Sequence, residues 1–140
     1  GRITGNLSCF DGADGCRRLV IRSSRAASLS RTLPDGVEVI TIEPGPDGKL
    51  APQTIIQRLS AIGLNKMLIE GGAWTVSEFI AAGAIDRLHV LVAPMILGSG
   101  KTGLALPPID KLSSALRPKA RVFPLADGDV LFDCDMRSGL

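Results

Sequence analysis

The chain has 140 residues, of which 45% are hydrophobic and 21% charged, and its formal net charge is +2. This composition is typical of a globular protein rather than a disordered one, and so small a net charge does not indicate a nucleic-acid partner. Gly, Pro or charged residues interrupt the longest apolar stretches, so we expect no membrane span. The length suffices for one domain with a hydrophobic core, which we expect over residues 1–140.

Cysteine and histidine are too few to predict a metal site. Cys9, Cys16 and Cys134 form no Cys-x-x-Cys motif, and His89 is the sole histidine. A structural zinc site needs four such ligands arranged together. We therefore expect no metal, free thiols, and a protein of the reducing cytoplasm.

The first part of the chain predicts a loop and then a short strand. Residues 1–15 are polar and glycine-rich, whereas Leu19–Ile21 is an apolar run of the kind found in buried strands. Arg22-Ser23-Ser24-Arg25 follows that strand. Hydroxyl and guanidinium groups suit a phosphate, because both donate hydrogen bonds to its oxygens. A solvated basic turn is the alternative, and on pattern alone it is the commoner outcome.

A second strand and a helix follow. Val37–Ile42 alternates and is rich in β-branched residues, which predicts a strand, and Glu43–Gly48 is a turn cluster expected at the surface. Pro52 is placed to begin a helix, and Gly63 is placed to end it. The apolar residues of this helix share one face, which we expect to lie in the core.

The stretch from Lys66 to Gly83 contains the most informative pattern. Met67–Ile69 predicts a strand buried on both faces, and Glu70 ends it before the pair Gly71-Gly72. Trp74–Ala82 then predicts a helix, with Gly83 as its C-terminal cap.

This strand–glycine–helix order suits a phosphate ligand. Paired glycines let the backbone approach a ligand closely, and the N–H groups at a helix N-terminus attract anions. Glu70 would lie at the carboxyl end of its strand, where open α/β sheets bind ligands. The alternative is an ordinary strand-to-helix turn with a carboxylate in water, and the pattern alone does not separate the two.

The last third predicts strands joined by a long loop. Leu88–Ala93 is apolar except at His89, and Leu104–Pro118 has too many prolines for a long helix, with at most a helical turn at Lys111–Leu116. Ala120–Pro124 and Asp129–Cys134 predict two strands of a hairpin.

Gly100-Lys101-Thr102 resembles the end of a P-loop but does not fit that motif. The P-loop needs a glycine five positions before Gly100, where Met95 stands, and it should open a helix. Pro107 and Pro108 follow instead, so we expect no nucleoside-triphosphatase.

Several of these pieces together closely resemble the reductase domain of bacterial riboflavin-biosynthesis proteins, within the dihydrofolate-reductase-like superfamily. The pieces occur in the family's order over about forty residues. They are Glu70-Gly71-Gly72, Phe79, Gly83, Ile85-Asp86, Leu88, Ala93-Pro94 and Leu97-Gly98-Ser99-Gly100.

The resemblance implies an α/β fold with a mixed, mostly parallel central sheet flanked by helices and closed by a C-terminal β-hairpin. It also implies that Ser8 contacts substrate and that Phe10 lies against the cofactor, because the family has a serine and an aromatic in this order. The family carries a long helix, a strand and an acidic loop after the position of Gly15. We therefore expect this chain to lack a central segment there.

The implied activity is NADPH-dependent reduction of the ribosyl group of 5-amino-6-(5-phosphoribosylamino)uracil to ribityl, in a homodimer. Glu70 would hydrogen-bond the substrate. No catalytic acid–base residue is expected, because the nicotinamide supplies the hydride. The alternatives are a relative acting on another pterin or pyrimidine, and a nucleotide-binding domain without catalysis.

The implied cofactor contacts fall into two groups. Ser23, Ser24 and Arg25 would meet the 2′-phosphate of NADPH. Gly71, Gly72 and the N–H groups of Ala73, Trp74, Thr75 and Val76 would hold the other phosphates. For the Trp74 side chain we expect partial burial without a catalytic role.

Overall fold

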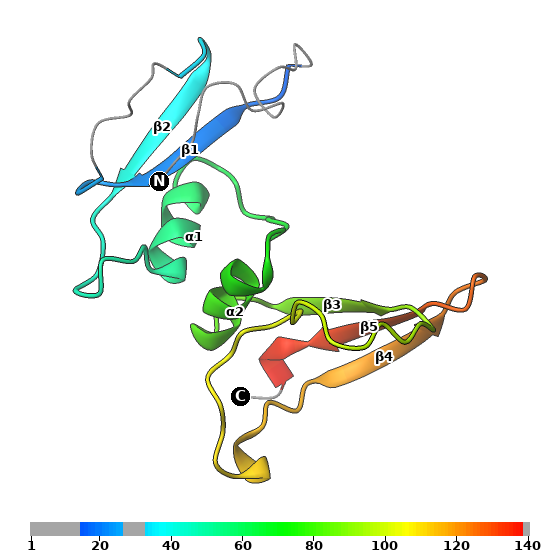
Figure 1. The fold of residues 1–140 in the computed structure, drawn as a ribbon. Helices are drawn as coiled ribbons and strands as arrows, with labels where there is room; N and C mark the ends of the chain where they lie inside the picture. Colours follow the sequence, from blue (N-terminus) through cyan, green and yellow to red (C-terminus); the bar gives the residue numbers. More distant parts are fainter. Residues whose placement is uncertain (1–14, 27–32, 139–140) are drawn as a thin grey trace. The chain divides into compact units, whose positions relative to one another are not determined.

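The computed structural model describes residues 15–26 and 33–138, and the chain divides into two compact units, Gly1–Met67 and Leu68–Leu140. The first unit contains two parallel strands, β1 (Arg18–Ser23) and β2 (Val37–Ile42) (Figure 1). They pair from Arg18 opposite Val37 to Ser23 opposite Ile42. The two predicted strands are confirmed here, as is the parallel part of the predicted sheet.

Helix α1 (Pro52–Ser60) follows β2 and lies against it. Pro52 is its first residue, as predicted. Gly63 has a φ of +88° and donates to the Ser60 carbonyl over 2.9 Å. Glycine reaches this left-handed conformation without steric cost, so it ends the helix as expected. The apolar face was expected in the core, but its helical residues are only half-buried and Ile62 is exposed. The buried residues described in this unit are Val20, Ile42, Pro44 and Pro52.

The second unit is a helix followed by a three-stranded antiparallel sheet. Helix α2 spans Ala73–Ala81, and β5 (Val130–Asp135) lies between β3 (Arg87–Val92) and β4 (Lys119–Pro124) (Figure 1). The 3₁₀ turns η2 (Leu112–Ser114) and η3 (Met136–Ser138) complete the unit. The predicted helix, hairpin and short helical turn are all confirmed.

Gly83 ends α2 in the predicted way. Its φ is +60°, its N–H donates to the Ile80 carbonyl over 2.9 Å, and the Ala84 N–H donates to the Phe79 carbonyl over 2.9 Å. These two bonds are those of the Schellman motif, in which glycine is the usual residue.

The predicted strand Met67–Ile69 is wrong. Residues 64–72 belong to neither described sheet, and the Leu68 side chain is 79% exposed. An apolar run of three residues forms a strand only where a neighbouring strand satisfies its backbone groups. The sequence shows the run but not whether such a neighbour exists.

The strand predicted around Leu88–Ala93 is present as β3, but its apolar side chains are not buried. β3 is at the edge of its sheet, and Val90, Leu91 and Val92 are exposed. The pairing in this unit is antiparallel rather than mostly parallel, because a hairpin such as β4–β5 must be antiparallel and β3 adds to it in the same sense.

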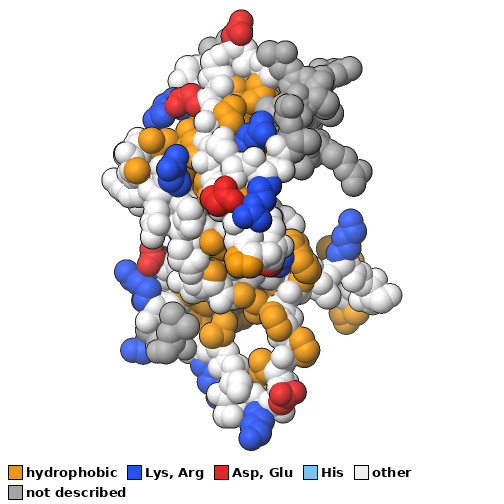
Figure 2. Space-filling model, turned by 90° about the vertical axis from the view of Figure 1, so that its left-hand side faces the viewer, with side chains coloured by type: hydrophobic (Ala, Val, Ile, Leu, Met, Phe, Trp, Pro, Cys, Tyr) orange, Lys and Arg blue, Asp and Glu red, His pale blue; other side chains and the backbone are white. Residues whose placement is uncertain are grey.

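Figure 2 shows apolar side chains at the surface among lysines and arginines. No helix in the described ranges is long and apolar enough to cross a membrane.

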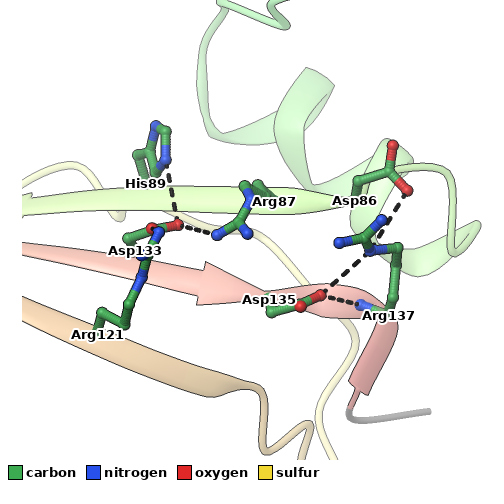
Figure 3. A network of polar contacts seen from close by, with 7 residues as sticks. All are labelled: Asp86, Arg87, His89, Arg121, Asp133, Asp135 and Arg137. Carbon is green, nitrogen blue, oxygen red and sulfur yellow. Dashed lines mark hydrogen bonds and ion pairs between the residues drawn. The ribbon is translucent and has the colours of Figure 1, made fainter.

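Asp133 organises the charges on one face of this sheet (Figure 3). It lies on the central strand β5, opposite His89 on β3 and Arg121 on β4. Its carboxylate accepts from Arg87 Nη1 at 2.7 Å and from Arg121 Nη2 at 2.5 Å, and His89 Nε2 lies 3.3 Å away. The Asp133 side chain is only 8% exposed. One buried carboxylate therefore links all three strands.

The hydrogen bonds from Arg121 and then Arg87 lower the pKa of Asp133 from 3.8 to about 2. A carboxyl whose pKa is lower in the folded chain than in the unfolded chain stabilises the fold above the unfolded value. This contribution is present above about pH 4 and is lost as the pH falls towards 2.

We expect Asp133→Asn to lower the melting temperature clearly at neutral pH, because Arg87 and Arg121 would face each other without their counter-charge. The difference from the unchanged chain should shrink as the pH falls from 4 to 2. Thermal melts followed by circular dichroism across this range measure it. Asp110→Asn, the same change in an exposed loop, is the control, and an equal loss in both variants would contradict the role given to Asp133.

Candidate functional site

The first group of predicted cofactor residues lies at the carboxyl end of β1. Because β1 and β2 are parallel and in register, the residues that follow both strands meet at the same edge of the sheet. The Ser24 N–H donates to the Ile42 carbonyl over 2.8 Å, which places Ser24 beside the start of the next loop. The residue after Ile42 is Glu43.

Glu43 is bound by the side chains that were predicted to hold a phosphate. Arg25 directs Nε and Nη2 at Glu43 Oε1, over 3.0 and 2.9 Å. The Ser24 hydroxyl donates to Glu43 Oε2, and the Arg25 N–H donates to Ser23 Oγ over 3.1 Å. The Ser24 hydroxyl and then the Arg25 guanidinium hold the pKa of Glu43 below its ordinary value.

This geometry shows what the turn can bind. A hydroxyl and a guanidinium converge on the two oxygens of one anionic group, as a bound phosphate would also require. The anion present is a carboxylate of the chain itself. Both side chains of the ion pair are about two-thirds exposed (64% and 66%), so an incoming ligand can reach them.

Glu43 was assigned only to a surface loop by the sequence. The available signal was its position directly after the strand Val37–Ile42. Two parallel strands end at the same edge of their sheet, so an acidic residue after one and a basic turn after the other are candidates for contact. Using that signal requires knowing that the two strands are neighbours.

The second group of predicted residues precedes and begins α2. Gly72 is the N-cap with φ −69° and ψ 167°, no side chain caps the helix, and its first turn holds no acidic residue. The Val76 N–H donates to the Gly72 carbonyl over 3.4 Å, which makes it the first intrahelical hydrogen bond. Contrary to the prediction, the Val76 N–H is therefore not offered to a ligand. An uncapped helix start of this kind carries partial positive charge.

The two glycines differ in what they do for the fold. A Cβ at Gly71 would lie 3.1 Å from the Cβ of Thr75, whereas a Cβ at Gly72 would meet nothing within 4 Å. A Cβ at Gly71 would therefore be crowded against α2, and Thr75 would have to shift to admit it. Gly72 is not required by packing or by its backbone angles.

Glu70 and Trp74 are both at the surface. Glu70 is exposed just before the glycine pair, and Trp74 is 65% exposed, more than the partial burial expected for it. Ser8 and Phe10 lie outside the described residues.

Groups of His, Cys, Asp and Glu able to hold a metal are absent from the described residues. Gly100-Lys101-Thr102 opens no helix, which fits the rejection of a P-loop.

A sequence model of a known protein family matches most of this chain. Residues 13–122 match the model of the RibD C-terminal domain. The chain belongs to this family. The resemblance drawn from Glu70-Gly71-Gly72 and the motif pieces after it is confirmed.

Related proteins with assigned names support the same family. The riboflavin biosynthesis protein RibD of Escherichia coli is 32% identical over 93 residues, which are 66% of this chain and 25% of that protein. RibD of Corynebacterium ammoniagenes is 42% identical over 67 residues, or 46% of this chain and 20% of that protein. The 2,5-diamino-6-ribosylamino-4(3H)-pyrimidinone 5′-phosphate reductase of Methanothermobacter thermautotrophicus is 29% identical over 65 residues, covering 45% and 30%. The chain thus spans about a quarter of the length of these relatives.

Solved structures support the fold. One form of Acinetobacter baumannii RibD matches 96% of this chain and 41% of that chain, with a TM-score of 0.60 and 24% identity. A pyrimidine reductase-like protein of Corynebacterium diphtheriae matches 84% of this chain and 49% of that chain, with a TM-score of 0.61 and 23% identity. These likenesses establish an α/β fold similar to that of RibD proteins.

We expect Gly71→Ala to destabilise the fold by about 1–3 kcal/mol, because the added Cβ overpacks against Thr75. Gly72→Ala should change stability by less, because alanine accepts these angles and restricts the unfolded chain, which offsets the preference for glycine at an N-cap. Urea denaturation of both variants measures the difference. Equal effects would contradict the separate roles assigned to the two glycines.

Proposed function

We propose that this chain is a riboflavin-biosynthesis reductase, which uses NADPH to reduce the ribosyl group of 5-amino-6-(5-phosphoribosylamino)uracil to ribityl. The observation that carries the proposal is the match of residues 13–122 to the RibD C-terminal domain. The Methanothermobacter relative, named as a pyrimidinone 5′-phosphate reductase, supports the substrate class. The proposal includes a single reductase domain over residues 1–140 with a dihydrofolate-reductase-like mixed sheet, a central segment missing after Gly15, and a cytoplasmic location.

The residues present fit a phosphorylated dinucleotide in two respects. The start of α2 has no capping side chain and no nearby acidic residue in its first turn, so it suits the phosphates shared by NADH and NADPH. Ser24 and Arg25 converge on an anionic group and suit the additional 2′-phosphate. The 2′-phosphate is thus assigned to residues of the first unit, and the other phosphates to residues of the second.

Hydride transfer from a nicotinamide does not require a nucleophile or an acid–base pair of side chains. When bound, the nicotinamide would supply the hydride for C1′ of the opened ribose, solvent would supply the proton, and the protein would contribute binding and orientation. Glu70, exposed beside the glycine pair, would hydrogen-bond the substrate, together with Ser8. Phe10 would lie against the cofactor.

The test is oxidation of NADPH that depends on the phosphorylated ribosylaminopyrimidine, with the ribityl product identified by mass spectrometry. Cofactor binding without turnover on this or a related pyrimidine or pterin would favour the non-catalytic alternative. Turnover on a different pyrimidine or pterin would correct the substrate and keep the reductase.

We expect Gly72→Val to weaken NADPH binding by about tenfold or more, because the side chain would stand where phosphate approaches the helix start. Trp74 is the sole tryptophan and lies two residues away, so its fluorescence follows the titration. The control is Gly103→Val, at another glycine whose Cβ would meet nothing within 4 Å. Unchanged affinity in a folded Gly72→Val variant would remove the phosphate assignment from this helix.

The protein forms a homodimer on this proposal, and the apolar side chains exposed on β3 support it. We expect sedimentation velocity at micromolar concentration to give the mass of two chains. Leu91→Lys, in the exposed strand, should shift the mass towards one chain, whereas Leu116→Lys, exposed outside the sheet, should not. A wild-type chain that sediments only as a monomer would contradict the dimer.

A further inference from the structure

We propose that Glu43 sets the preference between NADPH and NADH by weakening the binding of the 2′-phosphate. This inference rests on the proposed function, because it concerns the cofactor of that reaction. It assigns a specificity role to a residue that the sequence pattern left in a surface loop.

The first observation is that Glu43 occupies the donors a 2′-phosphate would need. Its Oε1 takes both Arg25 contacts, at 3.0 and 2.9 Å, and its Oε2 takes the Ser24 hydroxyl. A phosphate arriving at this turn must either displace the carboxylate or share the donors with it. Both outcomes reduce the affinity for NADPH.

The second observation is the charge. The pKa of Glu43 lies below its ordinary value, so the carboxylate is ionised at neutral pH beside a ligand group that carries nearly two negative charges. At roughly 6 Å in a water-like dielectric, repulsion between these charges corresponds to about tenfold in affinity. Arg25 attracts the phosphate, but Glu43 occupies its Nε and Nη2 donors, so removing the Glu43 charge should recover about this factor.

NADH meets a different environment at the same place. Its ribose carries a 2′-hydroxyl, which can donate to a carboxylate. An acidic residue after a strand serves this role in dinucleotide-binding folds. Glu43 directly follows β2, at the edge that also carries the β1 turn. Glu43 therefore repels the phosphate of NADPH and accepts a hydrogen bond from NADH.

The experiment measures dissociation constants of NADPH and NADH for the full chain and for Glu43→Gln, using Trp74 fluorescence at low ionic strength. Glutamine keeps the size of the side chain and can still accept from Ser24, but it removes the charge. An exposed ion pair contributes little to stability, so the variant should fold. We expect NADPH to bind about tenfold more tightly to the variant, with NADH unchanged or weaker.

Glu38→Gln is the matched control. Glu38 lies near the start of β2, is exposed, and forms a similar ion pair with Arg17 at 2.8 and 2.9 Å. This variant removes the same charge on the order of 16 Å from Glu43, where the same repulsion in a water-like dielectric corresponds to only about twofold in affinity. NADPH affinity should therefore change much less in this variant, and an equal gain in both variants would overturn the inference as an effect of net charge.

Arg25→Ala in two backgrounds gives an independent readout. In the unchanged chain this replacement removes only the charge of Arg25, because Glu43 already occupies the Nε and Nη2 donors. In Glu43→Gln the same replacement should cost about tenfold more, because the guanidinium can then also donate to the phosphate. Equal losses in both backgrounds would overturn the inference.

The remaining outcomes separate the inference from the proposed function. If the unchanged chain binds NADPH and Glu43→Gln binds it equally or more weakly, the specificity role is overturned and the reductase stands. If neither protein binds either cofactor, the nicotinamide-dependent function fails and the inference fails with it.

Discussion

Strand pairing decides which charged side chains meet in this protein. In the first unit, parallel register brings the ends of β1 and β2 to one edge, and Glu43 is thereby placed against Ser24 and Arg25. In the second unit, antiparallel register sets Asp133 between the two flanking strands, where Arg87 and Arg121 reach it. Neither cluster is local in sequence. The backbone ladder creates both, and a slip of one residue would turn each strand's side chains to the opposite face.

Within each unit, strand pairing provides most of the contacts between elements. Among the described residues, the buried aliphatic and aromatic side chains other than proline are few: Val20, Ile42, Phe79 and Ile80. Burial of apolar area is normally the largest stabilising term in a fold, so exposed apolar side chains on β3 and β4 represent surface still available for association. The ion pairs of Asp133 with Arg87 and Arg121 add contacts between the central strand and its two neighbours.

The sequence predicted the elements that depend on local chemistry. Pro52 and Gly63 set the ends of α1, Gly83 capped α2, and β-branched alternation located β2, since each of these signals acts within a few residues. Predictions that depended on distant partners were wrong or incomplete. Met67–Ile69 lacked a pairing strand, β3 lay at an edge, and Glu43 became meaningful only once β1 and β2 were known to be neighbours. The glycine pair was predicted as one motif, but a Cβ would be crowded only at Gly71, by Thr75.

The two candidate anion sites differ in a way that separates affinity from selectivity. The start of α2 has no side-chain cap and no acidic residue in its first turn, so a phosphate there would meet the partial positive charge of the helix. The β1 turn already holds a carboxylate, and a phosphate there must compete with it. On the proposed function, the phosphates common to both nicotinamide cofactors would bind at the first site and the 2′-phosphate at the second. On the proposed function, changes at α2 should therefore affect both cofactors alike, whereas discrimination between them depends on the charge balance among Ser24, Arg25 and Glu43.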